Sequence, residues 1–245
     1  ITRLKELENI RRDFVANVSH ELKTPITSIL GFVETLAEGE IEDPDEIQRF
    51  LGIVSAQAHR LNAIIEDLLQ LSRLEQHHDA IEKDHCRAEE IVAVVRQTVQ
   101  SAADEQAISI RDTYRGKTDI YVNKRLMEQA LTNLADNAIK YCPPRSEVTL
   151  QFEHHGSAAV FAVIDNGPGI ELPDQARVFE RFYRTDKARS RSLGGTGLGL
   201  AIVKHIARAH NGTVELTSVP GGGSTFSITI PQPESNGSDS EAENA

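Results

Sequence analysis

The chain has 245 residues, a formal net charge of −11 and an apolar content of 39%. This length allows one large or two small domains, and the acidic balance argues against broad electrostatic binding of nucleic acid. No apolar run approaches the roughly 20 residues that span a bilayer, and no signal-peptide pattern opens the chain. The two cysteines, Cys86 and Cys142, lack metal-ligand spacing and favour a reducing compartment.

The first part of the chain, residues 1–78, is predicted to form a helical hairpin. Apolar residues recur at steps of three and four over 4–36 and again over 47–71, which places each set on one side of a helix. Asp43 followed by Pro44 is typical of the N-cap and first position of the second helix. Because a lone hairpin cannot bury its seam well, two copies are expected to pair as a dimeric four-helix bundle.

A polar hinge is predicted at 79–84, followed by a domain over 85–231 and a disordered Ser/Asn/Glu-rich tail over 232–245. Helical and strand patterns interleave in the domain and indicate an α/β sandwich, a mixed sheet with helices on one face. In chain order, the predicted elements are a helix at 88–106, strands at 108–114 and 120–122, a helix at 124–141, strands at 148–154 and 158–164, a helix at 198–210, and strands at 213–218 and 224–230.

The first helix carries a histidine opposite its apolar side. His20 lies roughly 120–200° from the apolar residues around it, so its side chain is expected to face solvent. Glu21 follows directly, and Thr24 lies one turn on, on the same face. A neutral imidazole is a competent nucleophile, and a neighbouring carboxylate can orient the ring and take the displaced proton. Taken alone, such a histidine is more often a surface residue without a chemical role.

Residues 14–25, Phe-Val-Ala-Asn-Val-Ser-His-Glu-Leu-Lys-Thr-Pro, resemble the H-box of sensor histidine kinases of two-component systems. The resemblance implies that His20 is the phospho-acceptor and Glu21 its acid–base partner. It also implies that Thr24 positions water for dephosphorylating a response regulator. Residues 11–17 are similar to the PhoR-like, phosphate-regulon branch of that family.

Four polar residues of the helix predicted at 124–141 share one face: Asn133, Asn137, Lys140 and Tyr141. Amide oxygens one turn apart suit a hard cation such as Mg²⁺, which also binds phosphate oxygens. Lys140 adds a positive charge for phosphates. Taken alone, this helix face could equally be an ordinary solvated surface.

Two glycine-rich segments follow. Asp165 ends an apolar strand and can accept a hydrogen bond from the exocyclic amine of adenine, while Gly167 and Gly169 allow close backbone approach. Residues 194–200 then run into a helix, and the free amides of such a loop suit phosphate. Read separately, the first segment is an ordinary turn and the second a flexible linker.

Together, these three elements resemble the N, G1 and G2 boxes of the Bergerat-fold ATPases, the group of gyrase, Hsp90, histidine kinases and MutL. Phe179–Arg184 resembles the F-box of histidine kinases. The resemblance implies that Asp165 binds adenine N6, and that Asn133 and Asn137 hold Mg²⁺. The remaining residues expected to line bound ATP are Lys140, Tyr141, Gly167, Gly169, Arg184, Gly195, Gly197, Leu198 and Gly199.

The expected activity is that of a homodimeric protein histidine kinase. It would use ATP and Mg²⁺ to phosphorylate His20, pass the phosphoryl group to an aspartate of a response-regulator receiver domain, and dephosphorylate that regulator. The chain opens inside a helix, so it is expected to be the cytoplasmic fragment of an inner-membrane-anchored sensor, with any membrane part upstream. The alternatives are an ATP-driven conformational machine of the gyrase or Hsp90 kind and a non-catalytic dimeric scaffold with a degenerate nucleotide site.

Overall fold

The computed structural model describes residues 2–39, 41, 43–76, 81–185 and 195–233. The chain divides into two compact units, one formed by 1–73 with 178–201 and the other by 74–177 with 202–245. The tail predicted at 232–245 lies outside the described residues beyond 233.

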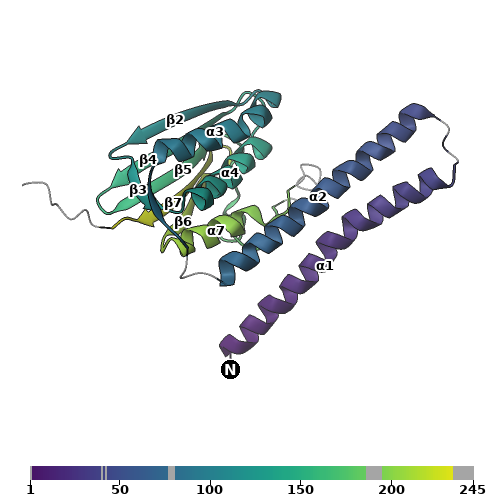
Figure 1. Cartoon of the computed structure of the whole chain (residues 1–245), viewed down its shortest axis with the longest axis horizontal. Helices are drawn as coiled ribbons and strands as arrows, with labels where there is room; N and C mark the ends of the chain where they lie inside the picture. The colour runs from purple at the N-terminus through teal and green to yellow at the C-terminus, as the bar shows by residue number, and fades with distance from the viewer. Residues whose placement is uncertain (1, 40, 42, 77–80, 186–194, 234–245) are drawn as a thin grey trace, which may run out of the picture. The chain divides into compact units, whose positions relative to one another are not determined.

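The predicted helical hairpin is confirmed (Figure 1). Helix α1 spans Thr2–Ala37 and helix α2 spans Pro44–Gln76. At the start of α2, the backbone N–H of Asp45 donates to Oδ1 of Asp43 over 3.0 Å. Asp43 therefore caps the first turn of α2, as predicted, and satisfies a backbone donor that would otherwise lack an intrahelical partner.

The apolar side chains of the hairpin divide into a packed set and an exposed set. Phe32 of α1 and Phe50 of α2 lie with ring centroids 4.9 Å apart, and Ile64 and Leu71 of α2 are fully buried. A second set stays more than two-fifths exposed in the single chain: Val15, Ile26, Leu30 and Val33 of α1, with Leu51, Ile65 and Leu69 of α2. The hairpin thus keeps an apolar surface that it does not bury by itself.

The second unit is built on a mixed five-stranded sheet in the order β2-β4-β5-β7-β6. Strands β2 and β4 run parallel, whereas the other neighbours are antiparallel. The strands span Ser109–Arg115 (β2), Glu147–His155 (β4), Ala158–Asp165 (β5), Thr213–Val219 (β6) and Gly223–Pro231 (β7). The predicted α/β class is therefore confirmed.

Alternation along the central strands explains which face of the sheet is covered. In β4, Val148, Leu150 and Phe152 are buried, whereas the residues between them are only half-buried, as expected for a strand with one face on the core. Helices α3 (Ala88–Glu105) and α4 (Lys124–Tyr141) pack on each other and on these strands. Helix α7 (Gly199–Ala209) contributes further buried side chains.

Two short elements were not predicted. Strand β1, Asp84–Arg87, pairs antiparallel with β3, Asp119–Val122, and begins at the last residue of the predicted hinge. Its four residues are polar or only half-buried, so they carry no apolar alternation, and the pairing with β3 defines the strand. Helix α5, Leu172–Gln175, is a single turn. Within the described ranges, no helix is long and apolar enough to cross a membrane.

His210 is a buried polar residue, with only 1% of its surface exposed. Its Nε2 accepts a hydrogen bond from the backbone N–H of Asn123 over 2.9 Å, and its Nδ1 lies 2.8 Å from the carbonyl oxygen of Ile206. Because a carbonyl can only accept, the ring must be neutral with its proton on Nδ1. Burial lowers the pKa of His210 from its ordinary 6.5, and the ring joins the start of α4 to the end of α7.

The neutral state of His210 predicts an acid-sensitive second unit. The unfolded chain binds a proton on His210 below about pH 6.5, and the folded chain resists that proton until its lower pKa is reached. The free energy of unfolding should therefore fall as the pH drops through this window, by up to about 1.4 kcal/mol per pH unit. Urea titrations between pH 8 and 5 measure it. His210→Gln should flatten the dependence, whereas the exposed His155→Gln should retain it.

Candidate functional site

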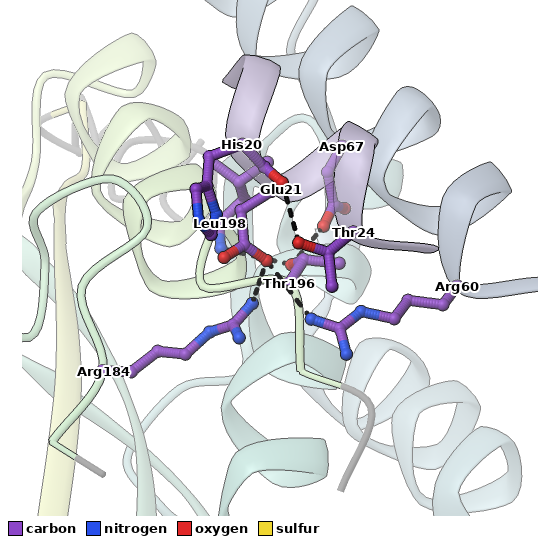
Figure 2. A network of polar contacts seen from close by, with 8 residues as sticks. All are labelled: His20, Glu21, Thr24, Arg60, Asp67, Arg184, Thr196 and Leu198. Atoms are coloured by element: carbon purple, nitrogen blue, oxygen red, sulfur yellow. Dashed lines mark hydrogen bonds and ion pairs between the residues drawn. The ribbon is translucent and has the colours of Figure 1, made fainter. Parts of the chain in front are cut away.

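The three H-box residues lie at the middle of α1. His20 is exposed, as predicted from the helical geometry, and Thr24 is exposed one turn further on. The Thr24 hydroxyl donates to the backbone carbonyl of His20 over 3.1 Å (Figure 2). Glu21 as a whole residue is half-buried. Its carboxylate points toward Arg60 and Arg184. His20 is thus accessible to a bulky phosphate donor, while its neighbour is held in place.

The Glu21 carboxylate is bound by two arginines from distant parts of the chain. Its Oε2 accepts hydrogen bonds from Nη2 of Arg60 on α2 at 3.2 Å and from Nη2 of Arg184 at 3.1 Å (Figure 2). The side chains of Glu21, Arg60 and Arg184 are only 15%, 11% and 5% exposed. Charges this far out of water require such partners, because an isolated buried charge is costly. Arg184, predicted to contact phosphates, binds a carboxylate in this structure.

The contact of Arg60 with Glu21 was not predicted from the sequence. At about 100° per residue, Arg60 shares one side of α2 with Ile64 and Leu71, both of which are fully buried. A charged residue in line with buried apolar residues requires a charged or polar partner. That register was visible in the sequence, but the identity of the partner was not.

The glycine-rich loop before α7 also contacts α2. The Thr196 hydroxyl donates to Oδ2 of Asp67 over 2.7 Å and accepts from the backbone N–H of Leu198 over 3.2 Å (Figure 2). The Leu198 side chain is fully buried, so only its backbone remains for the predicted nucleotide contact. Gly195 is half-buried and Gly199 is the first residue of α7. The preceding part of this loop, 186–194, lies outside the described residues.

Gly197 joins the loop to the F-box segment. Its carbonyl oxygen accepts from the backbone N–H of Phe182 over 2.8 Å, and its φ is +76°. A Cβ at this position would lie 2.9 Å from Cα of Phe182, which is too close for any side chain. Phe182 in turn lies 6.1 Å, centroid to centroid, from Phe14 of α1. Glycine is therefore required here by both backbone conformation and space.

Helix α4 presents the predicted polar face. Its bounds match the prediction, and the Asn123 side chain caps it by accepting from the N–H of Leu126 over 3.0 Å. The neighbouring apolar side of the helix is buried: Met127, Leu131, Leu134 and Ala138. The four polar residues predicted for Mg²⁺ and phosphate remain half-buried: Asn133, Asn137, Lys140 and Tyr141. Amide oxygens at partly shielded positions fit a hard cation that keeps some of its waters.

Asp165 is the last residue of β5 and sits in a partly buried environment. Its Oδ1 accepts from the backbone N–H of Gly167 over 2.9 Å and from the thiol of Cys142 over 3.6 Å. Burial raises the pKa of Asp165, and these hydrogen bonds offset part of that rise. The backbone of Ser224 also hydrogen-bonds this carboxylate. The carboxylate is thereby held in one orientation, from which it can accept a further hydrogen bond from a donor such as an exocyclic amine.

No role at the site was predicted for Cys142. Burial, and then the neighbouring Asp165 carboxylate, raise the pKa of its thiol to about 12. The thiol therefore keeps its proton at neutral pH and acts as the donor to Asp165. A Cβ on Gly167 would lie 2.7 Å from this sulfur, so the turn after β5 has room for glycine alone.

The turn after β5 packs against the β6–β7 hairpin. The N–H of Gly221 donates to the carbonyl of Pro168 over 2.7 Å, and the N–H of Ile170 donates to the Ser218 hydroxyl over 2.8 Å. Gly169 has a φ of +69°, and a Cβ there would overlap the Val219 backbone. This close approach fixes the turn that carries Gly167 and Gly169.

The protein-family comparisons match both parts of the chain. The model of the His Kinase A (phospho-acceptor) domain matches residues 10–77. The model of the histidine kinase-, DNA gyrase B- and HSP90-like ATPases matches residues 122–234. A phospho-acceptor hairpin followed by this ATPase fold defines the class, and the chain belongs to the histidine kinase family.

The curated relatives are sensor kinases. The sensor-like histidine kinase SenX3 of Mycolicibacterium smegmatis is 44% identical over 96% of this chain and 62% of its own length. The sensor protein SrrB of Staphylococcus aureus is 35% identical over 96% of this chain and 40% of its own length. The likeness to SenX3 is consistent with the predicted PhoR-like branch. The chain spans less than two thirds of these relatives.

Solved histidine kinases share the fold. AdeS of Acinetobacter baumannii matches with a TM-score of 0.69 at 28% identity, covering 87% of this chain and 98% of AdeS. Full-length ShkA, solved with AMPPNP, matches with a TM-score of 0.67 at 27% identity, covering 90% of this chain and 46% of ShkA. ThkA, solved with the response regulator TrrA, matches with a TM-score of 0.74 at 22% identity over 94% of this chain and 64% of ThkA.

The packing around Gly169 predicts that a side chain there would clash, whereas a side chain at Gly156 would not. Gly156 also has a positive φ, +55°, but a Cβ there would meet nothing within 4 Å. Gly156→Ala should lower the free energy of unfolding by about 1 kcal/mol through backbone strain alone. Gly169→Ala should lose about 1–3 kcal/mol more because it overpacks the turn. Urea unfolding of both variants measures the difference, and equal losses would contradict the close approach.

Proposed function

We propose that this chain is the catalytic core of a dimeric, ATP-dependent sensor histidine kinase that phosphorylates His20. The observation that carries the proposal is the H-box geometry. An exposed imidazole on α1 is followed by a carboxylate that two arginines hold. ATPases of the gyrase and Hsp90 kind have no such helix pair. An ATP-driven conformational machine would therefore not explain His20 and Glu21.

The proposed reaction is an in-line phosphoryl transfer. One nitrogen of the His20 ring attacks the γ-phosphorus, the bond from that phosphorus to the bridging oxygen breaks, and ADP leaves. Glu21 takes the proton from the other ring nitrogen, which leaves a neutral phosphoimidazole. The protein contributes mainly positioning and charge neutralisation, as is usual for phosphoryl transfer.

The residues proposed to bind the donor are those of the N, G1 and G2 boxes. Asp165, held in place by hydrogen bonds from Gly167, Cys142 and Ser224, accepts from adenine N6. Asn133 and Asn137 hold Mg²⁺, which neutralises phosphate charge when it is bound. The other proposed phosphate and lid contacts are Lys140, Tyr141, Gly169, Arg184, Gly195, Gly197, the Leu198 backbone and Gly199. The AMPPNP complex of the similar kinase ShkA supports ATP as the donor.

The proposed acceptor from phospho-His20 is an aspartate on the receiver domain of a response regulator. The similar fold of ThkA was solved with the regulator TrrA. Thr24, exposed one turn from His20, is proposed to position water for dephosphorylating the same regulator. Loss of label from a phosphorylated receiver domain would measure this second activity. We further propose that the chain works in the cytoplasm as part of a membrane-anchored sensor.

The exposed apolar residues of the hairpin support a homodimer. They come from both helices and would be covered if a second hairpin packed alongside to complete a four-helix bundle. Large exposed apolar side chains gathered on one element are typical of an interaction surface. A symmetric partner is favoured because a hairpin offers the same surface to its copy.

Labelling with [γ-³²P]ATP tests the kinase activity. The chain should acquire label that is lost in acid and retained in base, because a phosphoramidate is acid-labile. His20→Gln should abolish the label while leaving nucleotide binding intact, since it removes the acceptor only. Asp165→Asn should abolish both, since it removes the donor site.

The same experiment separates the alternatives. Steady ATP hydrolysis without a phosphoprotein would favour an ATP-driven machine. Absence of nucleotide binding by calorimetry would favour a non-catalytic scaffold. Acid-stable label, or label that persists in His20→Gln, would falsify the assignment of His20.

The dimer has its own test. Leu30 is 54% exposed on α1, and Leu30→Glu should place a charge in the dimer seam. Sedimentation should then show a monomer at micromolar concentration, where the parent chain is a dimer. Val94→Glu, at a position 41% exposed on α3, should remain dimeric. A monomeric parent chain would contradict the proposal.

A further inference from the structure

Helix α2 carries two charged residues on its buried side. Arg60, Ile64, Asp67 and Leu71 fall within about 60° around the helix axis. Ile64 and Leu71 are fully buried, and the Arg60 side chain is 11% exposed. Arg60 binds Glu21 of α1, and Asp67 binds Thr196 of the glycine-rich loop. In Figure 2, Arg60 points toward Glu21 of the H-box and Asp67 points toward Thr196.

Arg60 and Arg184 bind the same carboxylate oxygen. Nη2 of Arg60 lies 3.2 Å and Nη2 of Arg184 lies 3.1 Å from Oε2 of Glu21, and neither bond uses Oε1. The two arginines come from different kinds of segment. Arg60 projects from the interior of a long helix, whereas Arg184 lies two residues before the part of the chain that is not described.

We propose that Arg60 is a positioning residue for the phosphorylation of His20, acting through Glu21. This rests on the proposed function, in which Glu21 takes the imidazole proton and Arg184 serves the phosphates. A charge-assisted bond to Oε2 fixes the plane of the carboxylate. Oε1 then remains for the ring. A side chain on a rigid helix places such a group more precisely than one on a loop.

The two arginines have different proposed roles, because Arg184 is proposed to bind phosphates and Arg60 is not. When Arg184 binds the phosphates of ATP, Arg60 alone holds the carboxylate at Oε2. Arg60 therefore positions Glu21 during phosphoryl transfer, when Arg184 binds the phosphates. Its loss should slow the chemical step and leave the affinity for ATP unchanged, whereas loss of Arg184 should weaken both.

The test is a double-mutant cycle on the 245-residue chain, measured as the initial rate of ³²P transfer to His20 against ATP concentration. Arg60→Gln should lower kcat about ten-fold with the KM for ATP within about two-fold of the parent, and Arg60→Lys should recover part of the loss. Glu21→Gln should lower kcat about 100-fold or more. The double variant should be no slower than Glu21→Gln, because Arg60 acts only through that carboxylate.

A matched control removes the same charge from the same helix. Arg49 of α2 is exposed, and Arg49→Gln should retain the parent kcat. If Arg60→Gln unfolds the hairpin, as judged by circular dichroism, the cycle is run with Arg60→Lys. A double variant slower than Glu21→Gln by the full Arg60 factor, or a parent-like kcat in Arg60→Gln, overturns the positioning role. Parent-like kcat in Glu21→Gln instead overturns the proposed acid–base role of Glu21.

Discussion

The need to keep one carboxylate charged away from water organises the first unit. Glu21 is 15% exposed, and a guanidinium from α2 and another from the F-box segment bind its carboxylate. A carboxylate this far from water is costly unless it has such partners. One ionised oxygen therefore joins three segments that are 39 and 163 residues apart, beside an imidazole that stays in solvent. The arrangement separates a shielded carboxylate from an exposed imidazole.

Much of the fold and part of the candidate site were predictable, because they depend on residues within one element. The exposure of His20, the cap at Asp43, the bounds of α4 and its buried side all follow from helical periodicity and capping chemistry. The mixed sheet followed from alternation in strands such as β4. In each case, the decisive neighbours lie within a few positions along the chain.

What the sequence could not supply are contacts between elements. Arg60 gave a signal, since it falls in line with buried Ile64 and Leu71, but nothing along α2 pointed to Glu21. The burial of His210 was not predictable, because its partners, Asn123 and Ile206, come from two elements. Strand β1 exists only as the partner of β3. Tertiary pairing decides such cases, and local patterns carry little trace of it.

The two thiols differ in a way that matters to anyone attaching a reporter to this protein. The thiolate is the reactive form of cysteine, and access controls its modification. Cys142 is buried with a pKa near 12, whereas Cys86 on β1 is half-buried. A maleimide dye should therefore select Cys86 without engineering and leave Cys142 beside Asp165 unmodified. The β1–β3 ribbon thus offers a native attachment point for a fluorescent reporter.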